Sequence, residues 1–456
     1  MMGRKDDYQS KMEFIDLNTF VPSNHILRQI NEKIDFSFIY NKMEKYYSNL
    51  GRKSLDPVLL FKMLLIGYLF NVDSERELEQ EVNLNIAYRW FLGLDLTDPV
   101  PDHSTFSQNR RRRFKDSTVF QEIFDEIIKL CVEKGLVTGE VIVTDSTHIK
   151  ASASKSKVEK VTVERAPSQY LNTLELEAKK IEKELEEKRK ETGTKKRGRK
   201  PKGPSPETIS VVKTDSNAGV LSRPGKPTGP HYLAHTSIDT KNGIIVDIHP
   251  SPGNINDCEP FVERLKVIQD KFELDIKSVG ADRGYDTTPI HHGLKTLEIT
   301  GYISPIKYDT AFDTTSYRDF IYKRETDTYT CPNQKELTFT HLMSQGELYY
   351  KTYSAKTKDC KVCPFRDKCF GKTASRRTIS RPIAHELLEE NIQRTKTKEY
   401  KLVQKLRRVW CEGSFGTMKI KHNLYKTYKR GIEKIYEQCL FSALALNLKR
   451  MIKVIY

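Results

Sequence analysis

The sequence has 456 residues, which is long enough for two or three domains with hydrophobic cores. It carries 77 Lys and Arg against 61 Asp and Glu, and the net charge of +16 favours a polyanionic partner, nucleic acid more often than membrane. The most apolar window, 57–70, is too short to span a bilayer, and the polar first residues do not resemble a signal peptide. We therefore expect a cytoplasmic protein without a membrane segment.

Two helices are predicted from their starting signals. Asp56 and Pro57 form an N-cap and first-turn pair for the apolar helix that follows. A second helix is predicted over 74–90, because Ser74 followed three residues later by Glu77 is a capping-box pattern.

A third helix follows residues 101–104 and carries a basic run. Three helices with short joints and a basic last one predict a DNA-binding domain over 1–120. The side chains predicted to contact DNA phosphates are Arg110, Arg111 and Arg112. The alternative is a helical packing domain with a solvated arginine run.

Two β-branched runs each end in an aspartate. The run at 140–145 ends in Asp145, and the run at 276–282 ends in Asp282. In an α/β sheet, residues just beyond the strand ends converge in a crevice, so we expect these carboxylates to lie together. Between the two runs, an Asn-Gly turn at 240–243 predicts a β-hairpin.

The segment 155–206 differs in composition from its surroundings. Its apolar residues follow a heptad pattern for about two repeats, which predicts a charged helical arm. The basic tract at 195–203 resembles an AT-hook, although Lys200 interrupts the usual core. We expect Arg197 and Arg199 to contact the DNA backbone.

Four cysteines gather in the segment 307–395. The pattern Cys-x2-Cys with two further cysteines is adequate for a tetrahedral zinc site, and His341 is a possible substitute ligand. The cysteines of this site would be Cys331, Cys360, Cys363 and Cys369. The alternative is unpaired intracellular thiols. The other cysteines lie singly in apolar helical patterns and are predicted to be core residues: Cys131, Cys258, Cys411 and Cys439.

A long amphipathic helix is predicted over 401–428. Its buried stripe should include Leu402, Leu406, Val409, Trp410, Phe415 and Met418. Arg408, Glu412 and Lys419 are spaced by four and seven residues, which places them near one stripe of the helix. An acid between two cations is a good arrangement for a carboxylate beside phosphate anchors, but in an arbitrary helix it is more often an ordinary solvated salt-bridge ladder.

Three carboxylates repel one another unless cations neutralise them, so a cluster of Asp145, Asp282 and Glu412 implies bound metal. All-oxygen ligation with open positions favours Mg²⁺ or Mn²⁺. Two such ions can activate one oxygen and stabilise the leaving oxygen in phosphodiester cleavage.

At these residues the chain resembles the DDE transposases of bacterial insertion sequences. The resemblance rests on Thr-Asp145-Ser-Thr, Ala-Asp282-Arg-Gly-Tyr and Arg408-x3-Glu412-x6-Lys419. The group that it resembles carries a tyrosine–arginine–glutamate–lysine signature, whose tyrosine would fall at Lys405. The resemblance implies that the three acids hold two Mg²⁺ or Mn²⁺ ions, and that Arg408 and Lys419 contact phosphates near the scissile bond.

The resemblance also implies an α/β fold with a ribonuclease-H-like catalytic core. That core would comprise residues 135–154 and 207–306, completed by 396–456 with Glu412. An N-terminal all-α domain, a helical and basic insertion and a small Cys-rich insertion would make up the rest, at 1–120, 155–206 and 307–395.

The first hypothesis is therefore a transposase in the bacterial cytoplasm, associated with the nucleoid. It would bind the inverted repeats of its element and its target DNA, both double-stranded. It would cut and transfer strands with Mg²⁺, and act as a homodimer on DNA. The alternatives are a metal-dependent nuclease without strand transfer, and a DNA-binding protein that no longer cuts.

Overall fold

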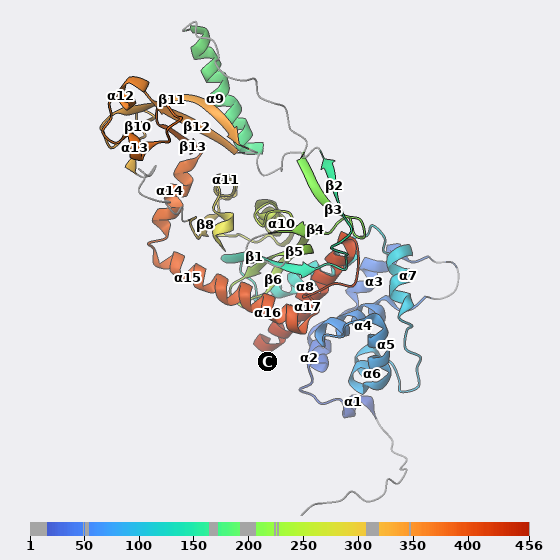
Figure 1. Ribbon diagram of the computed structural model, residues 1–456. Helices are drawn as coiled ribbons and strands as arrows, with labels where there is room; N and C mark the ends of the chain where they lie inside the picture. Colours follow the sequence, from blue (N-terminus) through green and yellow to red (C-terminus); the bar gives the residue numbers. More distant parts are fainter. Residues whose placement is uncertain are drawn as a thin grey trace, which may run out of the picture.

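The computed structural model describes residues 16–48, 50, 54–163, 172–191, 207–222, 225, 228–306, 319–345 and 348–455. It is a mixed α/β protein with a helical N-terminal region, as predicted (Figure 1). The basic tract at 195–203, with Arg197 and Arg199, lies outside the described residues.

The N-terminal region consists of short helices. They are α1 (Leu17–Phe20), α2 (Ile26–Lys33), α3 (Phe38–Met43), η1 (Glu44–Tyr46), α4 (Pro57–Leu69), α5 (Glu75–Leu84), α6 (Ile86–Leu92), α7 (Ser104–Arg112) and α8 (Val119–Glu133).

Both predicted helix starts are confirmed. The Asp56 side chain accepts a hydrogen bond from the Val58 N–H at 2.7 Å, and Ser74 Oγ accepts one from the Glu77 N–H at 3.2 Å. The prediction of a single helix over 74–90 is wrong. Asn85 ends α5 in an extended conformation and its side chain caps α6, which an Asn can do because it competes for backbone N–H groups.

The main sheet is built around β1 (Val141–Lys150). This strand pairs antiparallel with β5 (Gly229–Asp239) and parallel with β7 (Ser278–Ala281). The hairpin partner of β5 is β6 (Ile245–Pro252), as predicted, and β7 pairs parallel with β8 (Thr300–Ile303). The central part of the sheet therefore has the order β6-β5-β1-β7-β8. Two helices follow β6 and β7 in the chain, α10 (Phe261–Phe272) and α11 (Thr288–Thr296).

The segment after β1 extends the main sheet and adds the predicted arm. The strands β2 (Val158–Val163), β3 (Glu207–Val212) and β4 (Gly219–Leu221) continue the sheet beyond β5. The arm is α9 (Asn172–Glu191), and it packs against the second sheet, where Ala178 is buried with Ile383 (Figure 1).

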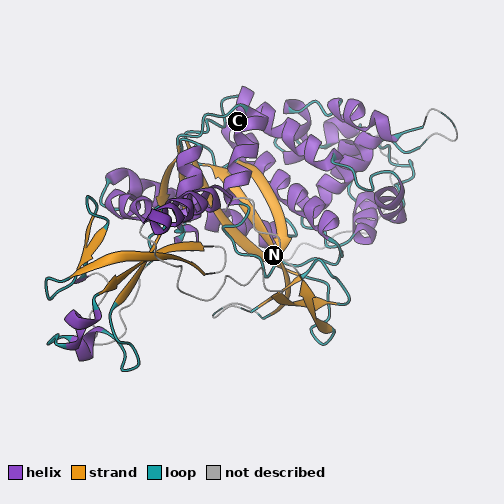
Figure 2. Ribbon diagram, turned by 90° about the horizontal axis from the view of Figure 1, so that it is seen from above, coloured by secondary structure: helices purple, strands orange, loops and turns teal. Residues whose placement is uncertain are grey.

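The second sheet has the order β13-β12-β11-β10-β9 and its own small core of aromatic and aliphatic side chains. Its strands are β9 (Ile321–Lys323), β10 (Thr328–Thr330), β11 (Glu336–Gln345), β12 (Leu348–Ala355) and β13 (Thr378–Pro382). Two short helices, α12 (Thr357–Lys361) and α13 (Arg366–Cys369), lie between β12 and β13. This sheet and the N-terminal helices lie on opposite sides of the main sheet (Figures 1 and 2).

The C-terminal part is helical. It contains α14 (His385–Arg394), α15 (Lys398–Arg407), a π-helical turn (η5, Arg408–Glu412), α16 (Gly413–Lys421) and α17 (Ile432–Ile455). The helix predicted over 401–428 thus ends at Lys421, because Asn423 takes a left-handed conformation (φ +57°) and its side chain donates to the Val72 carbonyl at 2.8 Å.

Helix α17 joins the two halves of the molecule. It packs against β6 on one side and against α4 and α8 on the other, so the helical region and the main sheet share one hydrophobic core. Asn447 binds both the N–H and the carbonyl of Ile245 at 2.8 Å, which fixes α17 to β6. None of the helices in the described ranges is both long and apolar enough for a membrane crossing.

Candidate active site

Asp145 lies on β1, and Asp282 directly follows β7, the parallel neighbour of β1. The register of β1 and β7 pairs Val143 with Gly280, and continuing it by two residues sets Asp145 beside Asp282. Neighbouring strands are about 4.8 Å apart, so the two carboxyl groups are within electrostatic reach. Burial and then the charge of Asp282 raise the pKa of Asp145 to about 6.

Asp145 is not at the tip of its strand, contrary to the prediction. β1 runs on to Lys150 because β5 pairs with it from Ile142 onward. The parallel pairing with β7 ends at Val143, so Asp145 still follows the parallel part of the strand. The expected convergence of the two aspartates therefore holds, although the reason given for Asp145 was wrong.

Arg407 makes an ion pair with Asp145. Its Nη1 lies 2.7 Å from Asp145 Oδ2, and both side chains are largely buried. The guanidinium lowers the pKa of Asp145, but less than burial and Asp282 raise it. Arg407 therefore offsets only part of the effect of burial and of Asp282 on the pKa of Asp145.

Helix α15 is fastened across the ends of β7 and β8. Gln404 Nε2 donates to the carbonyls of Ala281 at 3.0 Å and Tyr302 at 2.6 Å. The helix approaches β7 so closely that a Cβ at Gly280 would lie 2.5 Å from Val403 Cγ1. This packing fixes where the following π-helical turn meets β1.

The π-helical turn carries Glu412. It contacts β1, and Cys411 points inward to full burial while Glu412 is exposed. The predicted buried stripe is wrong for Leu402 and Val409, which are 57% and 54% exposed. A π-helical turn holds more residues than an α-helical one, so a stripe extrapolated at 3.6 residues per turn leaves the buried face at Val409. Leu402 lies before this turn, on α15, where the neighbouring Val403 is the buried residue.

The predicted phosphate anchors lie on this same helical run. Arg408 is exposed in the π-helical turn, and Lys419 is partly exposed on α16. Lys419 lines a cavity of about 790 Å³ between α16 and the N-terminal helices. Lys405, where the signature has tyrosine, is exposed on α15.

The arginine run on α7 divides into two kinds of residue. Arg110 makes a bidentate ion pair with Glu437, at 2.6 and 2.7 Å, and a second ion pair with Glu75 at 2.6 Å. Its guanidinium is therefore engaged inside the protein by two carboxylates, which leaves it unsuited to the predicted DNA contact. Arg111 and Arg112 are exposed.

The four late cysteines, all among the described residues, lie at one end of the second sheet, but no three of their sulfurs come within 4.8 Å of one another. Burial raises the pKa of the Cys369 thiol, Arg377 opposes this, and the other three cysteines raise it further, so all three lie within electrostatic reach of Cys369. The sulfurs also accept hydrogen bonds: Lys335 N–H donates to Cys331 at 3.3 Å and Asn333 Nδ2 to Cys363 at 3.6 Å. The cysteines predicted to be core residues are buried.

Among the described residues, the side chains of Glu79, Asp102 and His103 form a group of possible metal ligands whose ligand atoms lie within 4.8 Å of one another. His103 Nδ1 lies 2.8 Å from Glu79 Oε2, and the His103 N–H donates to the same oxygen at 2.9 Å. These contacts join α5 to the start of α7. In the described part of the chain, the three predicted acids are less compact than this group.

Two residues near the aspartates were missed by the sequence reasoning. Arg407 carried no signal that separated it from Arg408, since adjacent helical residues differ only in the direction in which they point. Asp257 raises the pKa of Asp145 and so lies near it, yet it follows β6 in a turn-rich stretch. Its position after β6, a third strand of the main sheet, was the feature of the sequence that could have pointed to Asp257.

Comparison with protein families gives two matches. Residues 15–112 match the family described as "Transposase domain (DUF772)", and residues 330–452 match the one described as "Transposase DDE domain". Both are transposase families, so the matches support a DDE transposase. A search of curated proteins found no match.

Solved structures give only weak likenesses. The piggyBac transposase synaptic complex with hairpin DNA aligns over 94% of this chain and 74% of its own, with 10% identity and a TM-score of 0.35. The Mos1 transposase paired-end complex with the left transposon end aligns over 58% and 64%, with 10% identity and a TM-score of 0.17.

Proposed function

We propose that this chain is the transposase of a bacterial insertion sequence, which cuts and joins DNA with divalent metal ions. The observation that carries the proposal is the proximity of Asp145 and Asp282, which follow the parallel pairing of β1 with β7 and interact electrostatically, with the turn that bears Glu412 packed on β1. The strand order β6-β5-β1-β7-β8 supports a ribonuclease-H-like core. The two family matches support the same reading from both ends of the chain.

The donor set suits Mg²⁺ or Mn²⁺. Carboxylate oxygens are the ligands that these ions prefer. Burial and then the charge of Asp282 raise the pKa of Asp145, and a cation would offset both effects. Arg407 already places a cation on Asp145. We infer that Asp145, Asp282 and Glu412 hold two ions.

When bound, two such ions activate the attacking oxygen and stabilise the leaving oxygen of a phosphodiester. The chain itself positions the DNA: Arg408 and Lys419, on the same helical run as Glu412, hold phosphates beside the scissile bond. Arg407 must release the Asp145 oxygen that it now contacts before that oxygen can ligate an ion. Asp257 adds negative charge beside Asp145.

DNA recognition is assigned to the N-terminal helices and the basic insertion. Arg111 and Arg112 are exposed on α7 and available to phosphates, and Arg197 and Arg199 add charge in the insertion. The ligands would be the terminal inverted repeats and the target duplex. Because two ends must be handled together, we propose a homodimer on DNA, in the cytoplasm and on the nucleoid.

The cysteine cluster is proposed as a structural zinc site formed by Cys331, Cys360, Cys363 and Cys369. Backbone and side-chain N–H groups donate to two of the sulfurs, as expected for thiolates that ligate a metal. Four sulfur ligands leave no open position, so zinc would stabilise the second sheet without taking part in cleavage.

The test is cleavage of a labelled DNA fragment that carries the flanks of the gene, with Mg²⁺. The wild type should cut at the repeat boundary and join the ends to a second DNA. Glu412→Gln should do neither, while Glu399→Gln, an exposed glutamate on α15 of the same helical run, should behave as the wild type.

Two outcomes would favour the alternatives. Cutting without joining would indicate a metal-dependent nuclease. Binding without cutting in all three proteins would indicate a DNA-binding protein that has lost catalysis.

A further inference from the structure

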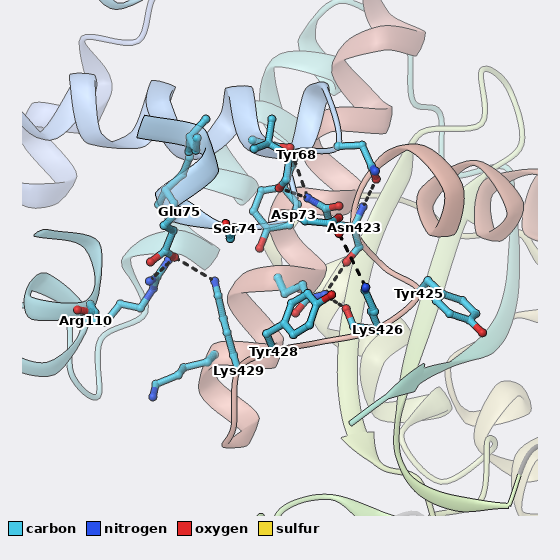
Figure 3. A pocket seen from close by; sticks show the side chains of 18 of the residues that line it. Tyr68, Asp73, Ser74, Glu75, Arg110, Asn423, Tyr425, Lys426, Tyr428 and Lys429 are labelled. Atoms are coloured by element: carbon cyan, nitrogen blue, oxygen red, sulfur yellow. Dashed lines mark hydrogen bonds and ion pairs between the residues drawn. The ribbon is translucent and has the colours of Figure 1, made fainter. Parts of the chain in front are cut away.

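A cavity lies at the seam between the N-terminal helices and the C-terminal segment. Its volume is about 790 Å³, and it is lined by α4, α5 and α7 on one side and by α16, the loop 422–431 and α17 on the other. Figure 3 shows these side chains from close by. Of the residues that line this cavity, the function proposed above uses Lys419 and Arg111.

The lining is strongly cationic. It contains seven lysine and arginine side chains against two acids. Arg110 and Lys429 both turn toward Glu75, and with the buried Glu437 they form a balanced group (Figure 3). The surplus charge comes from the remaining cations, which are Arg111, Lys419, Lys426, Arg430 and Lys434, opposed by Asp73. An anionic ligand is therefore favoured.

Two tyrosine rings stand open in this cationic lining. Tyr425 and Tyr428 are 60% and 61% exposed, and Lys426 Nζ lies 4.6 Å from the centre of the Tyr428 ring (Figure 3). Exposed aromatic rings beside cations provide the stacking surface and the phosphate contacts that unpaired nucleotides need. Duplex DNA offers its phosphates but keeps its base faces stacked.

The loop that carries both tyrosines is held rigidly. The Lys150 N–H donates to the Tyr425 carbonyl at 3.1 Å, and the Thr427 N–H donates to the Lys150 carbonyl at 2.9 Å. Gln438 Nε2 donates to the Lys426 carbonyl at 2.9 Å. The rings are thus presented on a preorganised backbone, which lowers the entropic cost of binding.

Helix α16 and strand β1 each connect a predicted metal-binding acid to this cavity. Lys419 follows Glu412 by seven residues, about 10 Å along a helix. Lys150, which pairs with the tyrosine loop, follows Asp145 by five residues of β1, about 17 Å along a strand. A DNA strand at the acids would reach the cavity within roughly three to five nucleotide steps.

We propose that this cavity binds unpaired nucleotides of the DNA strand that is cut, with bases stacked on Tyr425 and Tyr428 and phosphates held by Lys419, Arg430 and Lys434. The proposal rests on the function proposed above for the identity of the polyanion. It adds that the DNA must be opened within a few nucleotides of the scissile bond.

The test is fluorescence anisotropy with the full chain and without added Mg²⁺ or Mn²⁺, using a labelled 15-nucleotide single strand and the duplex of the same sequence. The variants are Tyr425→Ala with Tyr428→Ala, and Tyr425→Phe with Tyr428→Phe, which keeps the rings. The alanine pair should weaken single-strand binding by about fivefold or more for each ring and duplex binding by less than about twofold. The phenylalanine pair should bind as the wild type does. Lys434→Gln should lower the salt slope for the single strand by about 0.7.

An equal loss for both DNA forms, no loss in the alanine pair, or a phenylalanine pair as weak as the alanine pair would each overturn the proposal. A thermal melt of every variant shows that it is folded. Glu412→Gln should bind the single strand and the duplex as the wild type does. Single-strand binding that depends on the rings, in a protein that never cuts, would retain this inference and refute the proposed function instead.

Discussion

Glu437→Gln should destabilise the seam between the two halves of the protein. The Glu437 carboxylate is 5% exposed and accepts from Arg110 at 2.6 and 2.7 Å and from Lys429 at 3.1 Å. Burial raises the pKa of Glu437, but these two cations outweigh it and lower the pKa to about 2. With the neutral amide of glutamine at position 437, Arg110 and Lys429 would share Glu75 as their one remaining carboxylate partner in this group.

The expected loss is about 3.5 kcal/mol in the free energy of unfolding. The pKa of Glu437 falls from an unfolded value near 4.5 to about 2, and each unit corresponds to about 1.4 kcal/mol. Breaking a buried ion pair by removing one partner costs about 3–5 kcal/mol, which agrees. Because the folded pKa is lowered, this stability is present above pH 4.5 and is lost as the pH falls toward 2.

Urea unfolding can follow both sides of the seam, because the chain has two tryptophans. Trp90 lies on α6 and Trp410 in the π-helical turn, so Trp410→Phe and Trp90→Phe each leave one reporter. Glu437→Gln should lower the midpoint for both reporters, whereas Glu433→Gln, exposed one turn earlier on α17, should not. A loss below about 1 kcal/mol, or an equal loss in the control, would refute the reasoning.

Three further results are expected. Gly280→Ala should destabilise the protein by about 1–3 kcal/mol in thermal melts, because its Cβ would lie 2.5 Å from Val403 Cγ1, and adding Val403→Ala should restore part of the loss. Asp145→Asn should stabilise the metal-free protein by up to about 3 kcal/mol at pH 7, because folding raises the pKa of Asp145 to about 6 and so disfavours its ionised form. This loss of folding free energy is complete above pH 6 and disappears as the pH falls toward 3.8. A stability difference that does not change with pH would contradict this. Cys360→Ser should abolish one bound zinc per chain in elemental analysis while Cys258→Ala keeps it, and a purified wild type without zinc would remove the basis for this expectation.

Local signals in the sequence predicted local structure well. Asp56 and Ser74 begin their helices as predicted, because an N-cap depends only on residues two or three positions away. The adjacency of Asp145 and Asp282 was also predictable, since parallel strands of one sheet carry their following residues to the same edge.

The contacts that decide the site were not predictable in this way. Arg110 finds Glu437, a partner 327 residues away, and no pattern within α7 distinguishes it from Arg111. Arg407 rather than Arg408 reaches Asp145 because α15 is fastened by Gln404 to β7 and β8. The π-helical turn then changes the phase of the helix, which a period of 3.6 residues cannot anticipate.

The docking of α9 on the second sheet joins two segments that are far apart in the chain: α9 lies between β2 and β3, and the second sheet lies between β8 and α14. Ala178 on α9 is buried with Ile383, and Ile181, Leu342 and Tyr349 pack around them. A chain that lost one segment would uncover apolar side chains of the other, at a cost in solubility. We therefore expect the two segments to be inherited as one unit, so that related sequences contain both or neither.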